Sequence, residues 1–131
     1  MTPGPLHVRI ADGKGIVTPE PFRREVLVLL SPLLQPQLEG TGVMIGYTEV
    51  QPGQQGSRHK HPTEAELWMF FGGAGRAVVG EQEYLTGPGS VVYTPPDTYH
   101  QFFNTGAEPV KLFWSYAPPG AEQSVLEGAF T

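Results

Sequence analysis

Histidines and carboxylates with the spacing of metal ligands lie in one short stretch near the middle of the chain. His59 and His61 are one residue apart, and Glu64 and Glu66 follow closely. Side chains of an extended segment alternate between two faces, so both imidazoles point the same way and Lys60 points the opposite way. Two imidazoles with a carboxylate nearby are suitable ligands for a divalent transition metal. An isolated H-x-H pair is nonetheless more often two surface histidines than two ligands.

A second stretch, residues 89–104, supplies a third histidine after a Pro-Pro-Asp turn. The first stretch fits the pattern G-x5-H-x-H-x4-E-x6-G at Gly53, His59, His61, Glu66 and Gly73. The second fits G-x5-P-x-G-x2-H-x3-N at Gly89, Pro95, His100 and Asn104, with Asp97 in place of the second Gly. Asp tolerates tight-turn geometry better than most residues. The pair of stretches resembles the two conserved-barrel motifs of the cupin superfamily.

The resemblance implies an all-β fold, a cupin-type jelly-roll β-barrel or double-stranded β-helix with little helix. It makes the ligands of one divalent transition metal His59, His61, Glu66 and His100. Three imidazoles and one carboxylate suit Fe, Mn, Ni, Cu, Co or Zn, and four protein ligands of a six-coordinate metal leave two positions open. Glu64 would leave two residues too many before Gly73, so Glu66 is favoured as the carboxylate ligand, with Glu64 as an acid beside the site.

Alternation along the strands also predicts the lining of a pocket beside these ligands. Side chains that share a strand face with the ligands point inward. On the last long strand, Lys111 is expected to face water, so the side chains that alternate with it also point inward. They are Trp68, Phe70, Phe102 and Trp114. For each one, plain core filling is the simpler explanation. Together they describe a dry, aromatic pocket suited to an apolar or aromatic small molecule.

Three further side chains carry groups able to transfer protons near such a site: Tyr47, Glu64 and Tyr116. A non-redox reaction at a metal needs a group of this kind within reach of the substrate. Tyr47 is the weakest candidate, because the loop at 52–58 leaves its register open. Arg58 and Lys60 flank the histidines, but alternation aims them outward as solvated charges.

Eight to ten strands joined by turns are predicted to position these residues. The strands are expected over 7–10, 26–31, 43–51, 66–71, 76–79, 83–85, 90–94, 99–104 and 110–117. A short helix over 21–30 competes with the second of these, and another helix is expected over 121–127. The 131 residues form a single domain. Its parts are a core barrel over about 40–117, N-terminal strands within 6–31 and a C-terminal tail over 118–131.

Composition excludes several classes of function. The chain has no cysteine, which rules out disulfides and thiolate ligands. Its formal net charge of −5 argues against nucleic acid as a partner. The sequence opens without a leader pattern and contains no apolar run long enough to cross a bilayer. A cytoplasmic protein with a small-molecule substrate and no membrane partner is therefore expected.

The expected metal supports three functional hypotheses. The first is an oxygen-dependent, dioxygenase-like oxidoreductase acting on an apolar or aromatic molecule. The second is a non-redox isomerase, cyclase, decarboxylase or lyase, in which the metal polarises a substrate oxygen. Trp68 stands where the cupin-type sulfoniopropionate lyases carry a tyrosine, which counts against a lyase. The third is a metal-dependent binding protein without turnover. Strands that are apolar on both faces, over 67–71 and 110–116, also predict a homodimer.

Overall fold

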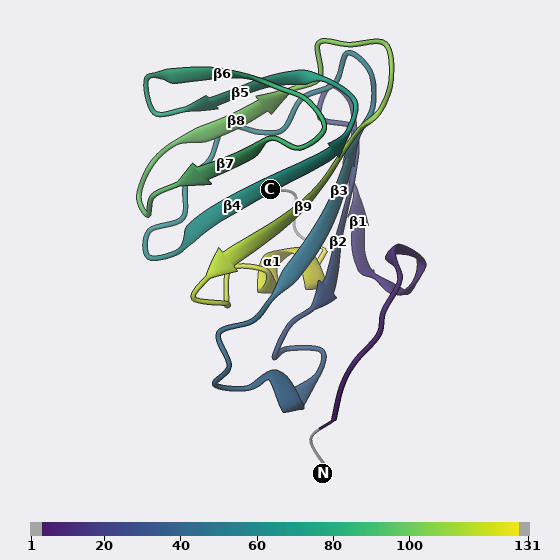
Figure 1. Ribbon diagram of the computed structural model, residues 1–131, viewed down its shortest axis with the longest axis vertical. Coiled ribbons are helices and arrows are strands. Elements are labelled where there is room, and N and C mark those ends of the chain that lie inside the picture. The colour runs from purple at the N-terminus through teal and green to yellow at the C-terminus, as the bar shows by residue number, and fades with distance from the viewer. Residues whose placement is uncertain (1–3, 129–131) are drawn as a thin grey trace.

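The computed structural model describes residues 4–128, which form two β-sheets that face each other (Figure 1). The larger sheet has the strand order β1-β2-β3-β9-β4-β7, and the smaller has the order β6-β5-β8. The strands are β1 (Lys14–Val17), β2 (Arg24–Leu30), β3 (Ile45–Val50), β4 (Ala65–Gly72), β5 (Gly75–Val79), β6 (Gln82–Thr86), β7 (Val91–Thr94), β8 (His100–Phe103) and β9 (Val110–Ala117). Every paired neighbour in both sheets is antiparallel.

This arrangement is the predicted jelly-roll β-barrel, or double-stranded β-helix, with very little helix. The expected C-terminal helix is present as α1 (Gln123–Leu126), which contacts β1 and β2. The competing helix over 21–30 is wrong, because residues from Arg24 onward pair with β1 and β3 as strand β2. No helix within residues 4–128 has the length and apolar character needed to span a membrane.

The inner face of the larger sheet is built by residues that alternate along each strand. On β9, Leu112, Trp114 and Tyr116 are buried, while the residues between them are partly or fully exposed. The register places Trp114 between Gly46 and Trp68 on its two neighbouring strands. A Cβ atom at Gly46 would lie 2.2 Å from the Trp114 ring, so only glycine leaves room for this indole. Large aromatic side chains can therefore fill the barrel interior.

One expected element differs from the structure. The strand expected over 7–10 is absent, and the chain instead forms a single 3-10 turn at Ile10–Asp12. The carboxylate of Asp12 accepts a hydrogen bond from the Arg9 backbone at 2.9 Å, which favours the turn over an extended edge strand. The segment before β4 forms no regular strand. It meets the smaller sheet through isolated bridges at Gln55 and His59.

Candidate metal centre

Four side chains from three parts of the chain converge inside the barrel. His59 and His61 lie in the connection before β4, Glu66 is near the start of β4, and His100 begins β8. One ligand atom from each lies within 4.8 Å of the others. Backbone hydrogen bonds of 2.9 and 3.1 Å hold His59 directly opposite His100. The four side chains that the motifs single out are thus brought together.

The ring orientation of two of these histidines is fixed by backbone carbonyl groups. The Nδ1 atom of His59 lies 2.8 Å from the Ser57 carbonyl oxygen, and that of His100 lies 3.0 Å from the Thr98 carbonyl oxygen. A carbonyl oxygen only accepts hydrogen bonds, so each Nδ1 must carry the proton. In the neutral imidazole this leaves the lone pair on Nε2, which is the form a metal requires.

Polar atoms of the cluster are buried without hydrogen bonds. Within residues 4–128, the buried side-chain atoms lacking a partner include His61 Nε2, Glu66 Oε1 and His100 Nε2. The His100 and His61 nitrogens lie 2.9 and 3.4 Å from Glu66 Oε1, but neither contact has hydrogen-bond geometry. An unpaired buried polar atom costs about 1–3 kcal/mol. A cation bound to these atoms would remove that cost, so the residues present fit a divalent transition metal.

The ionisation of the cluster also suits coordination. Burial, with a further contribution from nearby His100, lowers the pKa of His59 to about 4, so its ring is neutral at pH 7. Burial alone would raise the pKa of Glu66, but the His100 and His61 rings outweigh it and lower that pKa to about 2. A neutral imidazole and an ionised carboxylate are the forms that bind metals.

Trp68 holds the carboxylate of Glu66 in place. The two residues alternate onto the same face of β4, and the indole Nε1 donates a hydrogen bond of 2.6 Å to Glu66 Oε2. This bond occupies one carboxylate oxygen and leaves Oε1 turned toward the histidines. Carboxylates that ligate metals are commonly oriented by such a partner.

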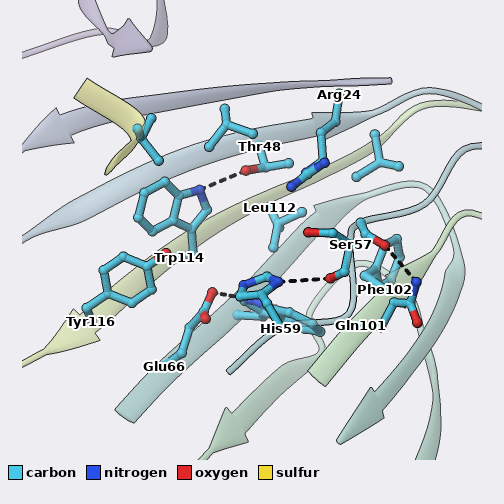
Figure 2. Close-up of a pocket in the computed structure, with 15 residues that line it drawn as sticks. Arg24, Thr48, Ser57, His59, Glu66, Gln101, Phe102, Leu112, Trp114 and Tyr116 are labelled. Carbon is cyan, nitrogen blue, oxygen red and sulfur yellow. Dashed lines mark hydrogen bonds between the residues drawn. The ribbon is translucent and has the colours of Figure 1, made fainter. Parts of the chain in front are cut away.

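A cavity of about 60 Å³ adjoins the cluster, and His59 and Glu66 form part of its wall (Figure 2). That volume has room for a ligand of only a few non-hydrogen atoms. Most of the remaining wall is apolar. Its apolar members are Val26, Val50, Trp68, Phe102, Leu112, Trp114 and Val125.

The predicted lining and catalytic candidates separate into two groups. Trp68, Phe102, Trp114 and Tyr116 line the cavity. The ring centre of Tyr116 lies 4.7 Å from that of His61, which places the phenol beside the cluster. Burial is the main reason that the pKa of Tyr116 lies well above its ordinary value. Its hydroxyl is therefore protonated at neutral pH and is a hydrogen-bond donor.

Three other candidates do not reach the cavity, which corrects the expectation for each. Phe70 lies in the core, packed at 5.1 Å between ring centres against Phe102. Tyr47 faces away from the cavity, because its neighbours on β3 at positions 46 and 48 occupy the inner face, and its ring contacts Phe71 and Phe113. The carboxylate of Glu64 accepts hydrogen bonds from the adjacent Thr63 and is not part of the cavity wall.

Polar residues that are not named positions of either motif also line the cavity. They are Arg24, Thr48, Ser57 and Gln101. A sequence signal existed for Arg24, because it stands in phase with Val26 and Val28, which are buried on the inner face of β2. The hydroxyl oxygen of Thr48 accepts a hydrogen bond of 2.8 Å from the Trp114 indole. Ser57 lies in the connection before β4, and Gln101 lies on β8 between His100 and Phe102, out of phase with the predicted lining.

The structure is a small antiparallel β-barrel with three imidazoles and a carboxylate beside an interior cavity. These features are those of a candidate metal-binding β-barrel. The cupin domain model matches residues 46–116, more than half of the chain. The chain therefore belongs to the cupin family.

The chain is similar to three further proteins. It is 32% identical to a glucose-6-phosphate isomerase of Thermococcus kodakarensis, with 86% of this chain and 69% of the isomerase aligned. It is also 32% identical to the mannose-1-phosphate guanylyltransferase of Salmonella typhimurium, but it spans only 15% of that enzyme's length. The crystal structure of a predicted oxalate decarboxylase from Thermotoga maritima superposes with a TM-score of 0.75 at 18% identity, covering 87% of this chain and 100% of that one. At this identity the last likeness is one of fold.

Proposed function

We propose that the chain is a small-molecule metalloenzyme in which His59, His61, Glu66 and His100 hold one divalent transition metal. The observation that carries the proposal is the convergence of these four buried or partly buried groups beside a cavity, with three of their atoms lacking a hydrogen bond from any residue of 4–128. A metal held by these residues would supply Lewis-acid or redox chemistry for a small molecule in the cavity. A closed structural site would need no cavity.

The reaction that the site supports best is an oxygen-dependent oxidation. Its walls are largely apolar and aromatic, which keeps bulk water away from a reactive centre. Groups suited to acid–base catalysis are few, because Tyr47 and Glu64 lie outside the cavity and the pKa of Tyr116 is far above neutral pH. A general acid or base works best when its pKa is near the operating pH.

A non-redox isomerase or decarboxylase is the second candidate, and Tyr116 is the observation that favours it. Its hydroxyl is protonated, lines the cavity and belongs to a ring packed against His61. In this role Tyr116 would donate a hydrogen bond or proton to a substrate oxygen. The likeness to an isomerase over most of the chain supports the same reading.

One assay separates these candidates. The protein is stripped of metal, reloaded with Fe, Mn, Ni, Cu, Co or Zn in turn, and incubated with a panel of small carbonyl compounds and carboxylic acids. An oxidoreductase consumes oxygen and stops working under anaerobic conditions. A non-redox enzyme converts its substrate equally well without oxygen and loses that activity in Tyr116→Phe. Retained metal with no turnover in either atmosphere would leave a binding protein and overturn the enzyme proposal.

A further inference from the structure

The C-terminal helix covers a part of the barrel interior that the smaller sheet does not reach. The larger sheet has six strands and the smaller one has three. Helix α1 lies apart from β5, β6 and β8 and contacts β1 and β2, at the edge of the larger sheet (Figure 1). Its Val125 belongs to the same hydrophobic core as Val26 and Val28 of β2, and Ala121 and Leu126 pack against that core. The segment after β9 therefore closes one side of the barrel.

Val125 is also part of the cavity wall. The other lining residues come from β2, β3, β4, β8 and β9 or from the connection before β4. Among the described residues, Val125 is thus the one part of the wall that an element after β9 supplies. The cavity holds only about 60 Å³, so a change of one or two methyl groups in its wall alters the space for a ligand substantially.

Buried hydrogen bonds hold this segment against the end of β2. Ser31 directly follows β2 and Glu122 directly precedes α1, and both side chains are fully buried. The Ser31 hydroxyl donates to Glu122 Oε2 at 2.6 Å, and the Gly120 backbone N–H donates to Glu122 Oε1 at 2.6 Å. A single helical turn is not stable on its own in water. These bonds and the burial of Val125 therefore keep α1 in place.

We propose that Val125 determines the size of the ligand that the cavity accepts, and that Ser31 and Glu122 are positioning residues for the wall that carries it. A smaller side chain at position 125 admits molecules that the native cavity excludes. Displacement of α1 opens a whole side of the cavity. The size limit applies to any occupant, whereas the role of that occupant as a substrate rests on the proposed function.

Quenching of tryptophan fluorescence measures access to the cavity without a known substrate. The chain has only two tryptophans, Trp68 and Trp114, and both are buried and line the cavity. Two neutral quenchers, acrylamide and the larger succinimide, are titrated into folded, metal-stripped protein. Val125→Ala should raise the quenching constant of acrylamide roughly twofold or more and leave that of succinimide unchanged. The matched control, Leu126→Ala, shortens an apolar side chain of the same helix that does not line the cavity, and should leave both constants near wild type.

The same measurement tests the two positioning residues. Ser31→Ala leaves Glu122 Oε2 without its donor, and Glu122→Ala removes both bonds. Each should increase quenching by acrylamide and by succinimide, because the wall itself moves. Glu122→Gln keeps an acceptor for the Gly120 N–H and presents an amide donor to Ser31, so it should restore quenching close to wild type. Wild-type quenching in folded Ser31→Ala and Glu122→Ala would overturn the positioning role.

The outcomes distinguish this inference from the proposed function. Acrylamide quenching that responds to Val125→Ala in protein that takes up no metal would sustain the size limit and overturn the metalloenzyme. Metal uptake with wild-type quenching in Val125→Ala, or with equal increases in Val125→Ala and Leu126→Ala, would do the reverse. If Val125→Ala does not fold, Val125→Ile decides, because it adds a single carbon atom to the wall of an existing cavity. Its acrylamide quenching should fall below wild type, and an unchanged constant would overturn the inference.

Discussion

The two faces of the six-stranded sheet distribute polar and apolar side chains in an unusual way. On the inner face, Arg24 and Glu66 are only 6% and 5% exposed, although they are charged residues in an aromatic core. On the outer face, Leu67, Phe71 and Tyr93 are 37%, 42% and 58% exposed. An antiparallel sheet with one face in water ordinarily buries apolar residues and exposes polar ones.

The difference suggests that the two faces serve different tasks. A buried carboxylate costs stability unless a partner compensates it, and Glu66 Oε1 has no hydrogen bond within residues 4–128, so a bound metal would best explain the inner face. Exposed apolar area on neighbouring strands is best explained by a covering surface. Each explanation can be tested separately by substitution, because residues on the two faces alternate along the same strands.

Removing the carboxylate of the cluster should have the largest effect on the inner face. Glu66→Gln replaces the single anionic group among the four proposed ligands, and metal affinity should fall by about a hundredfold or more. Glu64→Gln is the matched control, because that carboxylate lies nearby but bonds to Thr63. Elemental analysis and chelator competition measure both. Equal metal content in the two variants would contradict the assignment of Glu66.

Protonation of His59 at acidic pH should lower the free energy of unfolding of the metal-free protein. Its pKa falls from an ordinary 6.5 to about 4 on folding. The unfolded chain therefore binds more protons between those values, and the free energy of unfolding decreases as pH falls from 6.5 to 4. The expected loss is on the order of 3 kcal/mol. The raised pKa of His100 acts above pH 6.5, where it lowers stability as pH rises, and does not mask this window.

Urea unfolding of the metal-free protein at a series of pH values measures the loss. His59→Gln should flatten the slope between pH 6.5 and 4. His7→Gln, which alters an exposed histidine far from the motifs, should preserve it. A slope that is the same in wild type and His59→Gln would show that His59 titrates normally.

The hydrogen bond of the Trp68 indole can be tested separately from the packing of its ring. Trp68→Phe keeps an aromatic ring on the inner face but removes the hydrogen bond to Glu66 Oε2. Metal affinity should fall about 10- to 100-fold, as for other partners that orient a ligand. Trp114→Phe makes the same chemical change at a residue bonded to Thr48. Chelator competition should show little change in that control, and equal losses in both variants would point to packing.

Measurements of dimerisation test whether a second copy of the chain covers the outer face. Phe71 stacks on Phe113 with ring centres 4.8 Å apart, and we expect both to be covered in a homodimer. Phe71→Ser should weaken dimerisation by about 2 kcal/mol, without changing metal content. Leu85→Ser alters an exposed apolar residue of the smaller sheet and should leave the dimer intact. Analytical ultracentrifugation measures both, and a monomeric wild type would refute an interface on this face.

The fold and the convergence of the cluster were predicted through the resemblance of the two motifs to the cupin pattern, whereas the faces of single strands were predicted from alternation, which is a local property. Trp68 and Trp114 lie on the expected inner face for that reason. Tyr47 was misplaced because the loop after β3 hides the register between that strand and the histidines. Arg24 was missed although it alternates with Val26 and Val28, because the strand was predicted to begin only at residue 26 and its pairing with β3 joins distant parts of the chain. Long-range pairing of this kind leaves little trace in a single sequence.

The turn before His100 joins neither face of the larger sheet, and its effect should be the smallest. Asp97 has a φ of 57°, in the left-handed region, where the cupin pattern places glycine. Asp97→Ala should lower the free energy of unfolding by about 1 kcal/mol, whereas Asp97→Gly should be neutral or stabilising. Asp97 also pairs with Lys60 at 3.0 Å on the surface, so Lys60→Ala tests whether that ion pair matters. If backbone conformation governs this turn, urea unfolding will separate the Asp97 variants and leave Lys60→Ala at wild type. Equal losses in all three would instead assign the stability to the ion pair.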